Sequence, residues 1–129
     1  MAAPTIDRLD HLVLTVGSVD ASVAFYTRVL GFARTTFGAG RTGLSFGSQK
    51  INLHAVDSAI EPRAMRPMPG SADICFVTAA PIEHVIAHLN VCRVVIVAGP
   101  ARRTGALGPM RSVYFRDPDG NLVEVASYD

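Results

Sequence analysis

Residues 112–128 read SVYFRDPDGNLVEVASY and predict two strands joined by a tight turn. In the turn, Pro118 presets the bend, and Gly120 and Asn121 tolerate positive φ, so the turn sets the register of the second strand. That strand is apolar except for Glu124, and an unpaired carboxylate in an apolar setting costs several kcal/mol. Glu124 therefore either points to water on the outer face of the strand, or is paired or bound to a metal.

Length and composition restrict the class of protein. The 129 residues fit one domain, residues 1–129, and 49% of them are hydrophobic, which is enough for a real core. With 12 basic and 11 acidic residues, the chain has no charge excess that would favour nucleic acid or an anionic membrane. The expected partner is a small-molecule substrate or another protein chain.

The cysteines and the N-terminus indicate a compartment. Cys75 and Cys92 both lie in apolar stretches and form no CxxC pair, so they are expected to be buried thiols in a reducing environment. The N-terminal MAAPTIDRLD lacks the pattern of a secretory signal, and no apolar run approaches the roughly 20 residues that span a bilayer. A soluble cytoplasmic protein is expected.

The order of predicted elements repeats. In the first half, residues 11–16 predict a strand, residues 17–32 a helix capped by Ser18 and Gly31, and residues 32–37, 42–47 and 50–56 three shorter strands. In the second half, residues 73–78 predict a strand, residues 81–92 a helix, and residues 93–98, 111–116 and 121–127 three strands. The chain is thus expected to be α+β, with module one at about 5–57, a linker at 58–70 and module two at about 71–129.

Potential metal ligands occupy matching places in the two halves. His11 and Asp73 open the first strand of each half, 62 residues apart, and His54 and Glu124 lie in the closing strands, 70 residues apart. Because strands alternate faces, the His11 side of the first strand should line a concave sheet while Leu12 and its neighbours pack on the helix. Two imidazoles and one or two carboxylates suit a divalent first-row metal with room for water or substrate.

Several motifs resemble the vicinal oxygen chelate superfamily, which includes glyoxalase I, fosfomycin-resistance thiol transferases, extradiol dioxygenases and bleomycin-resistance proteins. The motifs are DHLVLTV, FYTRVLGF, INLH, GSADICF, RTGALGP and FRDPDGNLVEVASY, and together they span nearly the whole chain. The resemblance is strongest to small glyoxalase-domain-containing proteins. It implies two tandem βαβββ modules that form a curved mixed-sheet cup, completed in a homodimer.

The resemblance also implies a metal site built from His11, His54, Asp73 and Glu124. The metal would be Zn, Ni, Mn, Co or Fe, and the ligands could come from two chains. In many relatives a His stands where this chain has Asp73, so Asp73 could instead orient a ligand.

By resemblance to glyoxalase I, the expected function is that of a lyase or isomerase of the lactoylglutathione lyase type. Such an enzyme acts on a small carbonyl compound or thiol adduct through a metal-chelated enediolate, with glutathione or another thiol as co-substrate. Glu124 would be the catalytic base. The alternatives are a metal-free binding protein of the bleomycin-resistance type, an Fe(II) dioxygenase and a fosfomycin-type thiol transferase.

Other residues have open roles. Arg102 and Arg103 lie in a Gly- and Pro-rich stretch, residues 99–109, which is either a substrate-binding loop or a solvated surface connection. Tyr114 either reaches the cup or packs under it. His84 and His88 have the i, i+4 spacing of a helical metal pair but lie opposite the apolar stripe, so a solvated face is expected.

Overall fold

The computed structural model describes residues 1–129, and the same order of elements occurs twice. The first module contains β1 (His11–Val16), α1 (Val19–Leu30), β2 (Ala33–Phe37), β3 (Arg41–Phe46) and β4 (Gln49–Ala55). The second contains β5 (Asp73–Val77), α2 (Ile82–Val91), β6 (Ala98–Gly105), β7 (Gly108–Arg116) and β8 (Leu122–Tyr128). The predicted α+β fold of two βαβββ modules is confirmed. Neither helix is long and apolar enough to span a bilayer.

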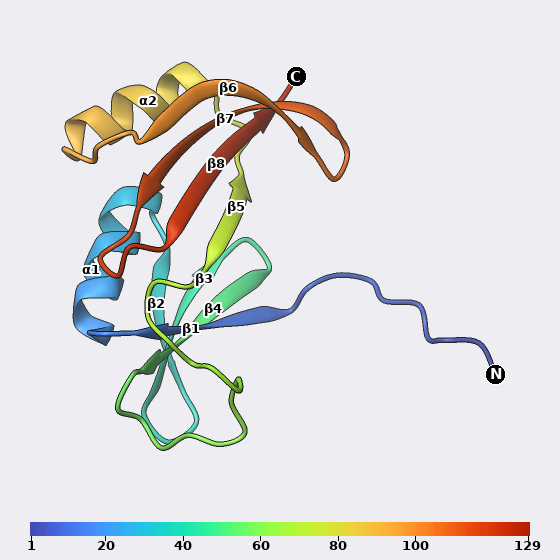
Figure 1. Cartoon of the computed structure of the whole chain (residues 1–129), viewed down its shortest axis with the longest axis vertical. Helices are drawn as coiled ribbons and strands as arrows, with labels where there is room; N and C mark the ends of the chain where they lie inside the picture. The colour runs from blue at the N-terminus through green and yellow to red at the C-terminus, as the bar shows by residue number, and fades with distance from the viewer.

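Each module forms its own four-stranded mixed sheet (Figure 1). The strand orders are β1-β4-β3-β2 and β5-β8-β7-β6. The first strand of each module pairs in parallel with the last, and the remaining pairs are antiparallel. As a result, β1 and β5 are edge strands whose outer backbone groups have no neighbouring strand in the same chain.

Helix α1 begins and ends where the sequence predicts. The Ser18 side chain accepts a hydrogen bond from the Ala21 N–H (3.1 Å), and Gly31 takes a left-handed conformation with φ of 69°. Both caps satisfy backbone groups that the helix itself leaves free.

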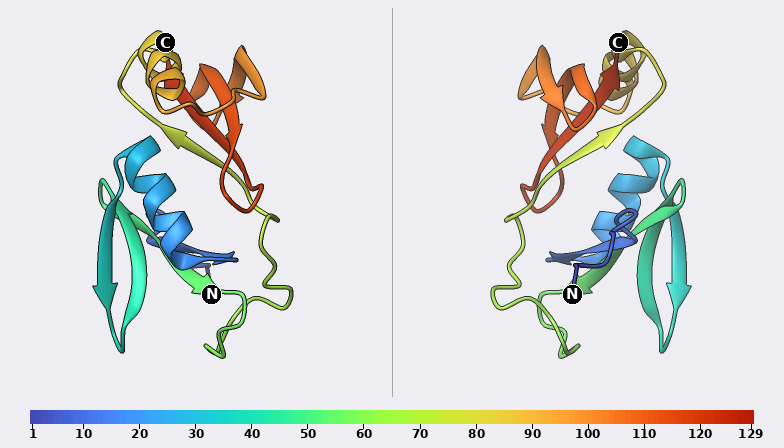
Figure 2. Two further views of the ribbon diagram at one scale, coloured as in Figure 1. Left: turned by 90° about the vertical axis from the view of Figure 1, so that its left-hand side faces the viewer. Right: turned by 90° about the vertical axis from the view of Figure 1, so that its right-hand side faces the viewer.

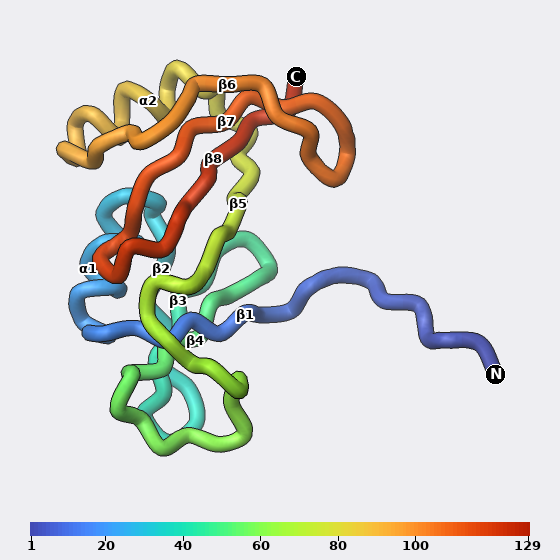
Figure 3. The backbone as a smooth tube through the Cα atoms, viewed as in Figure 1, coloured from blue at the N-terminus to red at the C-terminus, as the bar shows by residue number.

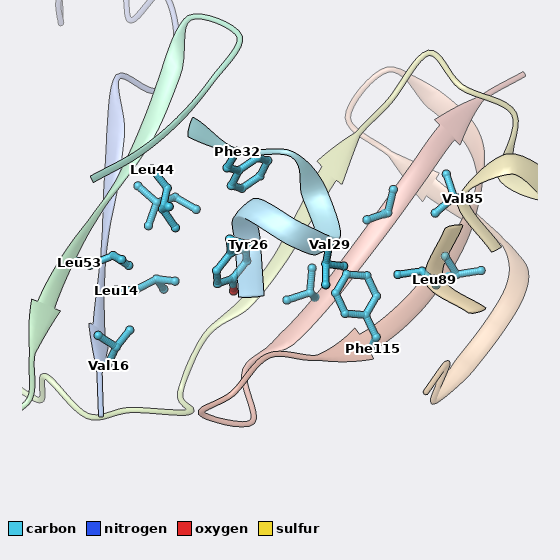
Figure 4. Close-up of a cluster of buried hydrophobic side chains, with 14 of the residues drawn as sticks. Leu14, Val16, Tyr26, Val29, Phe32, Leu44, Leu53, Val85, Leu89 and Phe115 are labelled. Atoms are coloured by element: carbon cyan, nitrogen blue, oxygen red, sulfur yellow. The ribbon is translucent and has the colours of Figure 1, made fainter. Parts of the chain in front are cut away.

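The core lies around α1, which is placed between the two sheets (Figure 4). One side of the helix packs on the buried face of the first sheet, and the other side meets Phe115 of the second sheet. Both modules contribute fully or nearly fully buried apolar side chains, among them Leu14, Val16, Tyr26, Val29, Leu44, Ile51, Leu53, Ile82, Leu89, Val113, Phe115, Val123 and Val125. Because one core serves both modules, the opposite face of each sheet points away from α1.

Two segments lie outside this core. Residues 1–10 extend away from the rest of the chain as an exposed arm (Figure 3). The linker between β4 and β5 loops to one side of the first module before it rises to the second (Figure 2). Its residues Ser58, Ile60, Arg63 and Pro67 line a small cavity together with His54, so the linker folds against one end of the first sheet.

The structure corrects one predicted strand and one predicted loop. Residues 93–97 are not a strand, and the stretch 99–109 is not a loop but most of a hairpin formed by β6 and β7. The Tyr128 hydroxyl holds its tip by accepting a hydrogen bond from the Leu107 N–H (3.1 Å). Strand β6 is an edge strand, a position where Gly and Pro are tolerated because one side of the backbone is unpaired.

Candidate functional site

The turn before β8 is held by the side chain of Asp117. Its Oδ1 accepts the backbone N–H groups of Asp119 and Asn121 (both 2.9 Å), and its Oδ2 accepts the Tyr26 hydroxyl and the Asn121 side-chain amide (both 2.8 Å). Asn121 in turn accepts the Ala72 N–H at the start of β5 (2.9 Å). The turn therefore joins β5, β8 and α1, and fixes the position of the strand that carries Glu124.

The backbone of the turn and its contact with Tyr26 agree in part with what the sequence predicts. Gly120 has a φ of 86°, as predicted, whereas Asn121 does not take a positive φ. Burial and the nearby Asp117 carboxylate raise the pKa of Tyr26, so its hydroxyl remains a donor at physiological pH. Tyr26 is thus a core residue, as predicted, and also a bridge between modules.

The open face of the second sheet carries Glu124 at its centre. Across the sheet, Glu124 stands directly opposite Cys75 on β5 and Tyr114 on β7. Asp73 precedes Cys75 by two residues and so shares this face. The two carboxylates are diagonal neighbours on adjacent parallel strands, and the charges of both act on the Cys75 thiol.

Cys75 was predicted to be a buried thiol, and that prediction is wrong. The residue is exposed on the same face as Glu124, and Cys92 is half-buried. Desolvation of the thiol, followed by the charge of Glu124 and a hydrogen bond to it, raises the pKa of Cys75 to about 11. The thiol is therefore protonated at physiological pH, and no pattern in the sequence separated it from a core cysteine.

Glu124 has one oxygen without a partner. Its Oε2 is buried and makes no hydrogen bond in the chain. A carboxylate oxygen in this state is costly unless a cation or donor reaches it. The interpretation of Glu124 as simply solvent-facing does not account for this atom.

The register of the first sheet corrects the predicted equivalence of His54 and Glu124. His11 pairs with Lys50, and Asp73 pairs with Leu122. His11 and Asp73 open the two modules, so their partners Lys50 and Leu122 occupy equivalent positions. Two residues further along each closing strand lie Asn52 and Glu124, which are therefore equivalent. His54 lies two positions further along β4, on the same face but in the next row of the sheet.

His54 is also occupied by another contact. It is 7% exposed, and its Nε2 accepts a hydrogen bond from Arg41 Nη2 (3.0 Å). Burial, together with the Arg41 charge, lowers the pKa of His54, so the ring is neutral at pH 7. A metal could use Nε2 only after Arg41 releases it.

His11 has a free ring nitrogen and an oriented ring. Its side chain is 44% exposed at the start of edge strand β1, and its Nδ1 donates to Asp10 Oδ2 (2.8 Å). This hydrogen bond is the main reason why the pKa of Asp10 is lowered. A carboxylate that holds one imidazole nitrogen is the usual arrangement around a metal-binding histidine.

The predicted substrate-binding residues are divided between two places. Arg103 Nε donates to the Tyr114 hydroxyl (3.0 Å), and this pair lies on the open face of the second sheet beside Glu124. Tyr114 therefore reaches the open face. Arg102 instead forms an ion pair with Asp129 at the C-terminus.

A large cavity lies elsewhere, between the modules. It has a volume of about 860 Å³ and an apolar wall that includes Phe32, Phe46 and Phe76. His88 lies on its border and is exposed, as predicted, although its Nε2 also donates a hydrogen bond to the Val29 carbonyl (2.8 Å). Cys75 and Val77 of β5 line this cavity and also share the face that carries Glu124.

The chain was compared with known proteins. A family model described as the Glyoxalase/Bleomycin resistance protein/Dioxygenase superfamily matches residues 8–125. The chain belongs to this superfamily.

Two relatives are similar over most of their length. Virulence protein STM3117 of Salmonella typhimurium is 52% identical over 123 residues, which are 95% of this chain and 85% of that protein. Its crystal structure superposes with a TM-score of 0.96 at 51% identity and covers 98% of this chain and 100% of that one. Glyoxalase domain-containing protein RDO1 of Mycosarcoma maydis is 49% identical over 124 residues, 96% of this chain and 70% of that protein.

The fold extends to a superfamily enzyme of lower identity. Lactoylglutathione lyase from Agrobacterium tumefaciens is 22% identical, with a TM-score of 0.73 and coverage of 95% of each chain. At this identity the likeness shows the shared fold and not a shared activity.

Within a single chain, the four predicted metal ligands do not lie close together. No group of three or more His, Cys, Asp and Glu side chains is close enough to hold a metal ion. His11 and His54 lie on the first sheet, and Asp73 and Glu124 lie on the second. The donor types nevertheless fit a divalent first-row metal, because the unpartnered Glu124 oxygen, a neighbouring carboxylate and a free imidazole nitrogen are suitable ligands.

Proposed function

We propose that the protein is a metal-dependent lyase or isomerase of the glyoxalase type, and that its metal site is completed between two copies of the chain. The proposed ligands are His11 from one copy and Asp73 and Glu124 from the other. The observation that carries the proposal is the buried, unpartnered Oε2 of Glu124 beside Asp73. His54 is left out of this set because Arg41 occupies its Nε2.

The two edge strands support the shared site. His11 and Asp73 occupy equivalent positions at the start of edge strands β1 and β5. Apolar side chains are exposed on both edges, including Leu12 (41%), Val13 (40%) and Val77 (59%). Open edges and exposed apolar side chains favour association with another chain. If β1 of one copy lies beside β5 of the second, His11 and Asp73 face one cup.

Different residues of the chain would then have separate roles in the reaction. When bound, a divalent metal would polarise two neighbouring oxygens of a small carbonyl compound or its thiol adduct. Glu124 would take a proton from the carbon beside the carbonyl and return it to the adjacent carbon. Asp10 would hold the His11 ring in place. Arg103 and Tyr114 would contact the far end of the substrate.

The proposal is tested by measuring metal content and turnover on the same samples. Protein purified without added metal should contain a divalent ion, and it should turn over methylglyoxal with glutathione or another thiol. Glu124→Gln and Asp73→Asn should each lower both readouts, while Arg102→Gln, which changes an ion pair away from Glu124, should leave metal content unchanged. Metal-free wild-type protein that also gains no turnover on loading would leave a binding protein as the better assignment.

A further inference from the structure

A pair of unpartnered side-chain oxygens lies on the open face of the first sheet. Thr35, Gly43 and Asn52 stand side by side across β2, β3 and β4. Gly43 has no side chain, and a Cβ at that position would lie 2.9 Å from Thr35 Oγ1 and 3.3 Å from Asn52 Oδ1. A Cβ would therefore collide with Thr35, and only a glycine lets the Thr35 and Asn52 side chains lie this close to β3.

The Thr35 and Asn52 oxygens beside Gly43 both lack partners. Asn52 is only 4% exposed, its side chain makes no hydrogen bond in the chain, and its Oδ1 is buried. Thr35 Oγ1 is also buried without a partner. Buried polar atoms almost always have a partner, and leaving one unpaired costs about 1–3 kcal/mol. An amide oxygen can only accept, so the missing group at Asn52 must be a donor such as a hydroxyl.

Two cations flank this pair of oxygens. Arg41 and Lys50 belong to the rows on either side of Gly43, and both approach the ring of Phe37, at 5.0 Å for Arg41 Cζ and 3.5 Å for Lys50 Nζ. Neither cation forms an ion pair with a carboxylate of the chain, and Arg41 Nε is buried without a partner. The Phe37 ring lies over Gly43, with its Cε1 3.3 Å from the Cβ position of that glycine.

We propose that this face binds a small hydroxyl-bearing anion, a carboxylate or phosphonate. The hydroxyl donates to Asn52 Oδ1 and contacts Thr35 Oγ1, and the anionic group lies between Arg41 and Lys50, where guanidinium and ammonium groups bind oxyanions. The Phe37 ring moves aside as the ligand enters. The proposed enzyme function is needed only for the further step of taking this ligand as the substrate. Binding itself does not depend on that function, because none of these residues is a proposed metal ligand.

The test uses two probes that differ by one hydroxyl, 2-hydroxyethylphosphonate and ethylphosphonate. Their affinities for the full chain are measured by NMR titration, once with metal and once after chelation. The wild type should bind the hydroxylated probe about fivefold more tightly, the effect of one net hydrogen bond. Asn52→Ala and the near-isosteric Thr35→Val should bring this ratio towards one. Lys50→Gln should weaken both probes, whereas Arg66→Gln, an equal loss of charge on the linker, should not.

Each contrary result overturns the inference. A ratio of one in the wild type, no binding of either probe, or a ratio that survives in both Asn52→Ala and Thr35→Val would mean that water satisfies the two oxygens. Equal weakening by Lys50→Gln and Arg66→Gln would mean non-specific attraction of anions. Titration of the chelated protein separates this inference from the proposed enzyme function. If the protein holds no metal and shows no turnover but still prefers the hydroxylated probe, this inference stands and the proposed enzyme function fails.

Discussion

Removing the charge of Glu124 should make Cys75 more reactive. The two residues face each other across β5 and β8, and the Glu124 carboxylate is the second cause, after desolvation, of the raised pKa of Cys75. In Glu124→Gln the pKa of Cys75 should fall from about 11 towards its ordinary value of 9.0. It should not reach that value, since the partial desolvation of the thiol persists.

The expected increase in the alkylation rate follows from the change in the pKa of Cys75. Only the thiolate reacts with iodoacetamide, and each unit by which the pKa falls increases the thiolate fraction at pH 8 about tenfold. A full return to the ordinary value would give about a hundredfold faster alkylation, so the substitution should give roughly a threefold to thirtyfold increase. The rate is measured by mass spectrometry in a Cys92→Ser background, where Cys75 is the remaining thiol.

A matched loss of charge provides the control. Glu61→Gln removes a carboxylate from the exposed linker and should leave the alkylation rate unchanged. If Glu124→Gln also left it unchanged, Cys75 and Glu124 would not share a face, and the register on which the site depends would be wrong.

Three further predictions concern stability. Tyr26→Phe removes the buried hydroxyl that donates to Asp117. Because the acceptor is a carboxylate, the free energy of unfolding measured by urea titration should fall by about 1.5–3 kcal/mol. A loss below about 0.5 kcal/mol would mean that this bridge between the modules contributes little. Gly105→Ala would place a methyl group against the Tyr128 hydroxyl, so about 1–3 kcal/mol should be lost, and an unchanged melting temperature would contradict the packing of the β6–β7 hairpin. The lowered pKa of His54 means that the unfolded chain binds a proton more readily than the native one, so metal-free protein should lose stability as pH falls below the ordinary value of 6.5. In His54→Asn the loss between pH 7 and pH 5 should be smaller, and an equal loss would show that other groups cause it.

The elements could be predicted from sequence because their signals are local. Ser18 and Gly31 mark the ends of α1, and the alternation of β1 separates Leu14, which is buried, from His11, which is exposed. These features depend on neighbouring residues only. Glycine and proline obscured β6, since they are common in loops and are also tolerated in an edge strand.

The alignment of ligands between modules could not be predicted in the same way. Residues two positions apart in a strand share a face, so periodicity cannot distinguish Asn52 from His54 as the counterpart of Glu124. Only the pairing of β1 with β4 decides, and that pairing depends on the lengths of distant loops. The exposure of Cys75 likewise follows from β5 being a free edge, which no local pattern indicates.

Mixing two inactive variants tests the shared metal site most directly. His11→Ala and Glu124→Gln each remove a ligand that the proposal assigns to a different copy, so each homodimer should lack bound metal. When the two are unfolded, mixed in equal amounts and refolded, half of the dimers should be mixed, and each of these should have one intact site. The proposal predicts recovery of about a quarter of the wild-type metal content and turnover. No recovery, with mixed dimers shown to be present by native mass spectrometry, would contradict a site shared between two chains.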